Sequence, residues 1–182
     1  GEHFEHWGFD SNVIIEKDWN ETITLKAGFE VNTVPARHFS GRSFKRNKAL
    51  WLSFVLQTPS SKLFIGGDSG YDAHFAEIGK QLGPFDLTSI KVGAYDWTWE
   101  GIHMNAEKAI SAHLDVKGKR MLPVHWGTFN LANHDWDEPI KIAQKGAIQN
   151  GIDLLTPKPG ELVDADLPFA STNWWENLKK KD

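Results

Sequence analysis

Residues 63–70 are Leu63-Phe64-Ile65-Gly66-Gly67-Asp68-Ser69-Gly70, an apolar run that ends in a glycine-rich turn carrying a carboxylate. A similar apolar run ends at a potential metal ligand in Val31–His38 and in Met121–His125. Because a buried sheet brings the ends of its strands to one edge, ligands that are far apart in sequence can converge there. Histidine and aspartate side chains suit zinc or a similar divalent ion. The sequence therefore predicts an α/β fold with a metal site formed by His38, Asp68 and His125.

Each of these three residues also has a structural explanation. Asp68 can stabilise its own turn or cap the helix expected after it. His125 can be a buried histidine with a hydrogen-bonded ring, and His38 can be an ordinary loop residue. The metal interpretation is preferred because the same pattern occurs three times.

The composition fits a single globular domain. The chain has 182 residues, of which 40% are hydrophobic, enough for one core but short for two. A formal charge of −4 disfavours non-specific nucleic-acid binding and favours a small-molecule substrate. The chain has no cysteine, so metal ligands must be His, Asp or Glu, and cysteine usage does not identify a compartment, although the cytoplasm is favoured. The apolar stretch Ala49–Leu56 is far shorter than the roughly 20 residues of a transmembrane helix.

The hydrophobic pattern predicts a β-rich first part followed by alternating strands and helices. Strands are expected at Val13–Ile15, Ile23–Leu25, Phe29–Val34, Ala49–Leu56, Lys62–Ile65, Leu87–Val92 and Arg120–Val124, and near Leu154 and Leu162. The fourth and fifth of these are expected to pair as a hairpin. Helices are expected at Ala73–Leu82, capped by Asp72, at Ala106–Asp115, capped by Asn105, and from Pro139 to Asn150, with Ile140, Ala143, Ala147 and Ile148 on one side.

Several longer segments carry a family resemblance. They are Pro35–His38, Gly66–Tyr71, Glu77–Lys80, Gly83–Leu87, Gly93–Tyr95, His125–Phe129 and Leu131–Asn133. Together they resemble the metallo-β-lactamase-fold hydrolases, and in particular the branch that contains N-acyl-phosphatidylethanolamine-hydrolysing phospholipase D and its bacterial relatives. The resemblance implies an αββα sandwich with two zinc ions, in which His38 binds one ion, Asp68 bridges both and His125 binds the other.

One part of the family pattern is absent from this sequence. The family's other ligands come from a His-x-His-x-Asp-His stretch, which the chain does not contain, and His3 and His6 do not supply it. We therefore expect residues 1–182 to form a single partial domain, incomplete at its N-terminal side. Because fewer ligands weaken metal binding, zinc occupancy is expected to be reduced or absent and activity low. Uncovered apolar sheet surface is expected to recruit a missing N-terminal fragment, to form a homo-oligomer or to destabilise the chain.

His103 is the next functional candidate. It lies just before the expected helix Ala106–Asp115, and the resemblance implies a position beside the substrate pocket, where it can contact a phosphate or protonate the departing oxygen. A local loop or capping role is the alternative. Trp97 and Trp99 are expected to bind apolar parts of a substrate, although aromatic residues also fill cores. His113 shares a helical face with apolar residues and is expected to be a core histidine.

These observations favour a zinc-dependent phosphodiesterase that acts through metal-bound hydroxide on a small-molecule phosphodiester or a phospholipid, with Asp68 and His103 as catalytic residues. Manganese and iron accept the same ligands. The alternatives are a sugar-phosphate lactonase of the same superfamily and a non-catalytic metal-binding or interaction module. Residues 171–182 are expected to form a short C-terminal helix or a tail.

Overall fold

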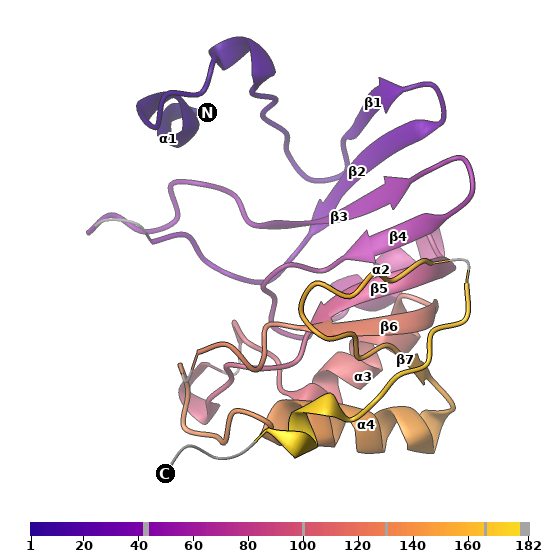
Figure 1. Ribbon diagram of the computed structural model, residues 1–182. Helices are drawn as coiled ribbons and strands as arrows, with labels where there is room; N and C mark the ends of the chain where they lie inside the picture. The colour runs from indigo at the N-terminus through magenta and orange to yellow at the C-terminus, as the bar shows by residue number, and fades with distance from the viewer. Residues whose placement is uncertain (42–43, 100, 130, 166, 179–182) are drawn as a thin grey trace.

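A seven-stranded mixed sheet forms the centre of the protein (Figure 1). The computed structural model describes residues 1–41, 44–99, 101–129, 131–165 and 167–178. The strands lie in the sheet in chain order: β1 (Thr22–Lys26), β2 (Phe29–Pro35), β3 (Leu52–Gln57), β4 (Lys62–Ile65), β5 (Phe85–Lys91), β6 (Gly118–Val124) and β7 (Asp153–Leu154). Strands β1 to β4 pair antiparallel, which confirms the predicted hairpin of β3 and β4. Strands β4 to β7 pair parallel and are therefore joined by helical crossovers.

Three helices make these crossovers and pack on one face of the sheet (Figure 1): α2 (His74–Gln81), α3 (Ala106–Asp115) and α4 (Glu138–Asn150). Helix α3 has the predicted bounds, and the Asn105 side chain caps it by accepting a hydrogen bond from the backbone N–H of Lys108. Helix α4 has Pro139 in its first turn and ends at Gly151, whose φ of 65° is left-handed. Residues that favour helix starts, Asn105 and Pro139, and helix ends, Gly151, thus set the bounds of the crossover helices α3 and α4.

The hydrophobic core lies between these helices and the sheet. Phe64 on β4 is fully buried, and its ring centroid lies 6.1 Å from that of Phe75 on α2 and 5.6 Å from that of Phe85 on β5. His113 on α3 is also buried, and its Nδ1 lies 2.8 Å from the hydroxyl of Thr88 on β5. The prediction that His113 is a core histidine is confirmed. This packing fixes the ends of β4, β5 and β6 relative to one another.

The opposite face of the sheet is covered only in part. The chain after β7 crosses it over β5 to β7 (orange to yellow in Figure 1). There Arg120 on β6 donates from Nη1 to the backbone carbonyls of Asp164, Ala165 and Leu167. Farther along the same face, the paired residues Phe54 and Ile65 remain 41% and 40% exposed. The described residues therefore form one sheet and one helical layer of the α/β architecture, with apolar surface left on the other side.

The first residues of the chain differ from the prediction. A strand was expected at Val13–Ile15, but the 3₁₀ turn η1 (Ser11–Val13) includes Val13, and residues 14 and 15 lie in no strand. Both η1 and the preceding helix α1 (Glu2–His6) lie apart from the sheet (Figure 1). The Asp10 carboxylate accepts a hydrogen bond from the backbone N–H of Asn12, which favours a turn over an extended strand. Val13 is 69% exposed, so its apolar side chain does not mark a buried strand.

Other expectations near helix and strand ends were also wrong. Asp72 does not provide the N-cap of α2, because the helix starts after Ala73, whose backbone N–H donates to the Asp72 carboxylate. Ile148 on α4 is 76% exposed rather than in the core, and Leu162 is 87% exposed and lies in no strand. The predicted C-terminal helix is the 3₁₀ turn η3 (Trp174–Asn177), with the Trp175 side chain buried, and residues 179–182 lie outside the described part of the chain.

The longest helix in the described part of the chain is α4, with 13 residues. Within the described ranges, none of the helices has both the length and the apolar character needed to cross a bilayer.

Candidate metal centre

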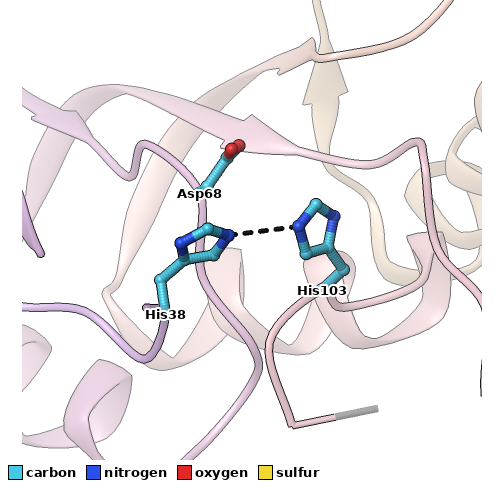
Figure 2. A group of neighbouring side chains, drawn as sticks. All are labelled: His38, Asp68 and His103. Carbon is cyan, nitrogen blue, oxygen red and sulfur yellow. Dashed lines mark hydrogen bonds between the residues drawn. The ribbon is translucent and has the colours of Figure 1, made fainter. Parts of the chain in front are cut away.

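Four side chains from separate loops meet at the carboxyl ends of the parallel strands. Asp68 follows β4, His125 follows β6, His38 follows β2, and His103 precedes α3. His38, Asp68 and His103 each offer a ligand atom, and these atoms lie within 4.8 Å of one another (Figure 2). The Nε2 of His125 lies 3.5 Å from a carboxylate oxygen of Asp68. The sheet edge predicted from sequence therefore brings His38, Asp68 and His125 together, and it adds His103.

A left-handed residue turns the chain after each of the strands β4, β5 and β6. Gly67 follows β4 with a φ of 59°, Ala94 follows β5 with a φ of 53°, and His125 follows β6 with a φ of 65°. A positive φ is uncommon for alanine and histidine and costs about 1 kcal/mol or more. Gly93 permits the close approach of two of these turns, because a Cβ there would lie 2.3 Å from the carbonyl oxygen of His125. These turns aim the side chains at a common space.

Buried Ser69 connects three of the site loops. Its hydroxyl accepts a hydrogen bond from the backbone N–H of Arg37, the neighbour of His38. Its backbone carbonyl accepts one from Met104, the neighbour of His103. Next to it, the N–H of Gly70 donates to the Arg37 carbonyl over 2.8 Å. The turn that carries Asp68 therefore also holds the two histidines in place.

The rings of His38 and His103 face each other, with Asp68 beside them (Figure 2). Their Nε2 atoms are 3.1 Å apart. Each ring also makes one contact to a backbone carbonyl, from Nδ1 of His38 to Phe39 at 2.8 Å and from Nδ1 of His103 to Ala94 at 2.7 Å. Both rings are thus held in orientation by the main chain.

A buried cation, Lys91, lies beneath the site at the end of β5. It is fully buried, and its Nζ donates to the carbonyl of Gly93 over 2.6 Å. Burial lowers the pKa of Lys91 to about 8, against the opposing attraction of Asp68. Burial, together with the charge of Lys91, lowers the pKa of His103 to about 4, so this ring is neutral at pH 7. Sequence reasoning missed Lys91, which lies within the expected apolar strand Leu87–Val92.

A cavity of about 490 Å³ opens above the centre. Its polar lining comes from Asp68, His103 and His125, and its apolar lining from Phe39, Ala94, Trp99, Ile102 and Leu131. Of the two tryptophans predicted to bind substrate, Trp99 borders this cavity. Trp97 is 87% exposed and borders a separate cavity of about 340 Å³, which it shares with His103. Phe39 and Leu131 are lining residues that the sequence analysis did not select, because their side chains resemble ordinary core residues.

The donor set fits a divalent ion. Two imidazole nitrogens and one carboxylate are ligands that zinc uses in catalytic sites with three protein ligands. Ligating histidines usually donate their second ring N–H to a carbonyl or carboxylate, and the Nδ1 of His38 has such a partner in the Phe39 carbonyl. Among the described residues, His38, Asp68 and His103 are the group of metal-type donors close enough to share one ion. The residues present therefore suit zinc, manganese or iron.

Comparison with known proteins agrees with this geometry. The family described as "Beta-lactamase superfamily domain" matches residues 1–126. An uncharacterized protein of Mycobacterium tuberculosis is 44% identical over 178 residues, which cover 96% of this chain and 48% of that protein. N-acyl-phosphatidylethanolamine-hydrolyzing phospholipase D 1 of Caenorhabditis elegans is 30% identical over 133 residues, covering 69% of this chain and 37% of that protein. The chain thus spans about half the length, or less, of these two relatives.

Solved structures show the same fold. A metallo hydrolase from Ignicoccus hospitalis, Igni18, superposes with a TM-score of 0.67 at 20% identity, over 89% of this chain and 64% of that chain. The metallo-beta-lactamase fold protein YhfI from Bacillus subtilis superposes with a TM-score of 0.61 at 15% identity, over 84% of this chain and 56% of that chain. Because the family match covers residues 1–126, the chain belongs to the beta-lactamase superfamily, that is, to the metallo-β-lactamase-fold hydrolases.

Proposed function

We propose that this chain supplies part of the active site of a zinc-dependent hydrolase that cleaves phosphodiesters. The observation that carries the proposal is the convergence of His38, Asp68 and His103, with ligand atoms within 4.8 Å, and of His125 beside Asp68. Such a centre lies at the ligand-binding edge of an α/β sheet. Family membership implies a divalent ion, and zinc is the ion that this donor set suits best.

In this proposal, His38, Asp68 and His125 would hold the metal, and the Asp68 carboxylate lies near both histidines. A bound divalent ion acts as a Lewis acid and lowers the pKa of water. The protein residues orient the substrate and exclude bulk water from one side of the centre. His103 borders the same cavity, and its neutral ring donates from Nδ1 to the Ala94 carbonyl, so its Nε2 is an acceptor. In this proposal Nε2 takes a proton from the attacking water and then gives it to the departing oxygen.

The proposed substrate carries an apolar group next to the phosphodiester. The rings of Phe39 and Trp99 and the side chains of Ile102 and Leu131 line the cavity above the ligands, and such a wall suits acyl or aromatic groups. A relative of this chain is named as a phospholipase D that hydrolyses an N-acylated phospholipid. We therefore place phospholipids first among candidate substrates, ahead of sugar-phosphate lactones.

Complete activity is proposed to require further ligands. The sequence lacks the His-x-His-x-Asp-His stretch of the family, and Phe54 and Ile65 leave an apolar sheet surface on which another layer can pack. A partner segment that covers this surface and adds histidines would complete a two-ion site. The chain alone is expected to bind metal more readily than it turns over substrate.

The test is a hydrolysis assay on this chain, alone and mixed with the portion of the Mycobacterium relative that it does not match. After treatment with chelator and reloading with zinc, the mixture is expected to release p-nitrophenol from bis(p-nitrophenyl) phosphate and phosphatidic acid from an N-acylated phospholipid. Asp68→Asn should abolish the zinc-dependent rate. His6→Ala is the matched control, because His6 is exposed on α1, far from the site in sequence.

The alternatives give different results in the same assay. Opening of a sugar-phosphate lactone without phosphodiester cleavage would favour the lactonase. Zinc binding with no turnover of either substrate class would favour a non-catalytic metal-binding module. Either result contradicts the phosphodiesterase proposal.

A further inference from the structure

A histidine on the loop before α4 contacts the loop that follows β5. The backbone N–H of Ala94 donates to Nε2 of His134 over 3.1 Å, across 40 positions in the sequence. The Nδ1 of His134 lies 2.9 Å from the carbonyl of Asp135. Because a backbone carbonyl can only accept, this Nδ1 carries a hydrogen, and Nε2 of the neutral ring is an acceptor. The tautomer of His134 is therefore the one that the N–H of Ala94 requires.

The carbonyl of the same residue, Ala94, orients His103. It accepts the Nδ1–H of His103 over 2.7 Å. Ala94 thus connects two histidines, since its N–H binds His134 and its C=O binds His103. With Nδ1 of His103 engaged in this way, Nε2 is the acceptor on the ring that borders the cavity of about 490 Å³. A rotation of the backbone at Ala94 would move this nitrogen.

The backbone at Ala94 depends on such contacts. Its φ of 53° is left-handed, a conformation that is unfavourable for alanine. The main chain keeps a conformation of this kind only where surrounding contacts determine it. Lys91 provides one contact, because its Nζ donates to the Gly93 carbonyl over 2.6 Å. His134 provides another, and since Ala94 is buried, loss of this acceptor is expected to leave its N–H unpaired and to favour a different backbone conformation.

The ring of His134 is itself held in place. It is half-buried and stacks on the ring of Tyr95, with centroids 4.5 Å apart and planes inclined by 27°. The hydroxyl of Tyr95 donates over 2.6 Å to the carboxylate of Glu138, the first residue of α4. Among the described residues that line the two cavities beside His103, His134 does not occur. His134 can therefore act on His103 through Ala94, without touching a substrate.

We propose that His134 is a positioning residue for His103. By accepting the N–H of Ala94, it holds the left-handed turn whose carbonyl keeps Nδ1 of His103 protonated, and it thereby keeps Nε2 of His103 as the proton acceptor at the cavity. This inference rests on the proposed function, in which His103 moves a proton. It concerns the orientation of the ring and holds whichever divalent ion the centre binds.

Nitrogen NMR of the histidine rings tests the proposal in the full 182-residue chain. In the wild type, His103 should be protonated at Nδ1 alone, and a coupling through the hydrogen bond should connect the backbone nitrogen of Ala94 with Nε2 of His134. A His134 ring protonated at Nε2, or the absence of this coupling, would overturn the proposal without any variant. The ring signals of His113, in the core, report whether each variant below keeps the fold.

Two substitutions at position 134 isolate the hydrogen bond. His134→Leu removes the acceptor and keeps a side chain of similar bulk, whereas His134→Gln supplies an amide oxygen that can accept the N–H of Ala94. His134→Leu should speed the exchange of the His103 Nδ1–H with water at least tenfold, and His134→Gln should keep it within threefold of the wild type. Unchanged exchange in His134→Leu, or no rescue by His134→Gln, would contradict the proposed role.

Asn133→Ala is the matched control. Asn133 joins the same two loops, because its Nδ2 donates to the carboxylate of Asp96 over 3.0 Å, but this hydrogen bond bypasses Ala94. The exchange of the His103 Nδ1–H should therefore stay within threefold of the wild type. An effect as large as that of His134→Leu would mean that any contact between these loops suffices, and the specific role of His134 would be wrong.

The hydrolysis assay of the mixed chains separates this inference from the proposed function. There His134→Leu should lower kcat at least fivefold and change KM less than twofold, and His134→Gln should restore most of the rate. The expected ring spectra together with no hydrolysis by the wild-type mixture would uphold the positioning of His103 and contradict the hydrolase. Hydrolysis with an unchanged kcat in His134→Leu would do the reverse.

Discussion

Two histidines, one buried and one half-buried, mark two regions of this molecule. His113 lies in the core between α3 and the sheet, and His103 lies in the loop before α3, at the metal centre. Burial lowers the pKa of both to about 4. They differ in what the ring faces: His113 meets the hydroxyl of Thr88, which can donate or accept, whereas His103 meets the Nε2 of His38. A lowered pKa alone therefore does not separate a core histidine from a histidine at the candidate site, but the groups that surround the ring do.

The difference extends to the surroundings of each histidine. The core region is made of buried side chains that pack against one another, so we expect it to carry the stability of the fold. The site region has open space, exposed side chains and backbone strain, so we expect it to carry little stability. Four measurements test this division.

The largest effect is expected in the core. Phe64→Ala removes a fully buried ring that packs against Phe75 and Phe85, and such truncations cost about 3–5 kcal/mol. Urea unfolding followed by circular dichroism measures this loss. A cost under about 1 kcal/mol would contradict the expectation that the core, rather than the site region, carries the stability of the fold.

The second effect concerns pH and His113. Its folded pKa of about 4 lies below its unfolded value of 6.5, so between these values the unfolded chain binds more protons and stability falls as pH falls. From pH 7 to pH 5 the loss is about 2 kcal/mol, at 1.36 kcal/mol per pH unit below 6.5. His113→Asn keeps a polar partner for Thr88 and should show a shallower loss. Equal slopes in unfolding experiments at both pH values would argue against a neutral His113.

A smaller effect is expected on the partly open face of the sheet. Phe54 is 41% exposed, so Phe54→Ser should cost less than about 1 kcal/mol in the isolated chain, well below the cost at Phe64. The same variant should reduce any self-association, as measured by sedimentation velocity. Self-association that persists unchanged would show that another surface is responsible.

The smallest effect is expected at the centre itself. The side chain of Asp68 is 41% exposed, so in the metal-free protein Asp68→Asn should change stability by no more than about 0.5 kcal/mol. Thermal melts with and without zinc sharpen the comparison, because zinc should raise the Tm of the wild type but not of the variant. A large destabilisation without metal would mean that Asp68 supports the fold directly.

The sequence predicted the core elements well because their signals are local. The bounds of α3 follow from Asn105 and the apolar spacing, and β4 from a short run between polar turns. Val13 and Leu162 were misjudged because apolar residues were taken to mark strands, yet both are largely exposed. Local composition does not tell whether a partner is available to cover a side chain.

The site was predictable only in part, for a related reason. His38, Asp68 and His125 each follow an apolar run, and that repeated signal located the sheet edge. The contact of His103 with His38 spans 65 positions in sequence, and no local pattern predicts it. Lys91 was missed because a single lysine in an apolar strand resembles an edge residue until its burial is known.

The left-handed backbone at Ala94 and His125 has a consequence for how this protein can change. Both residues occupy a conformation that glycine adopts without penalty. Laboratory selection for heat resistance alone would therefore favour glycine at position 125, which relieves torsional cost and deletes a donor near Asp68. At this turn, greater stability is gained only with the loss of a histidine side chain near Asp68. Only selection that also requires metal binding at the proposed centre would retain His125.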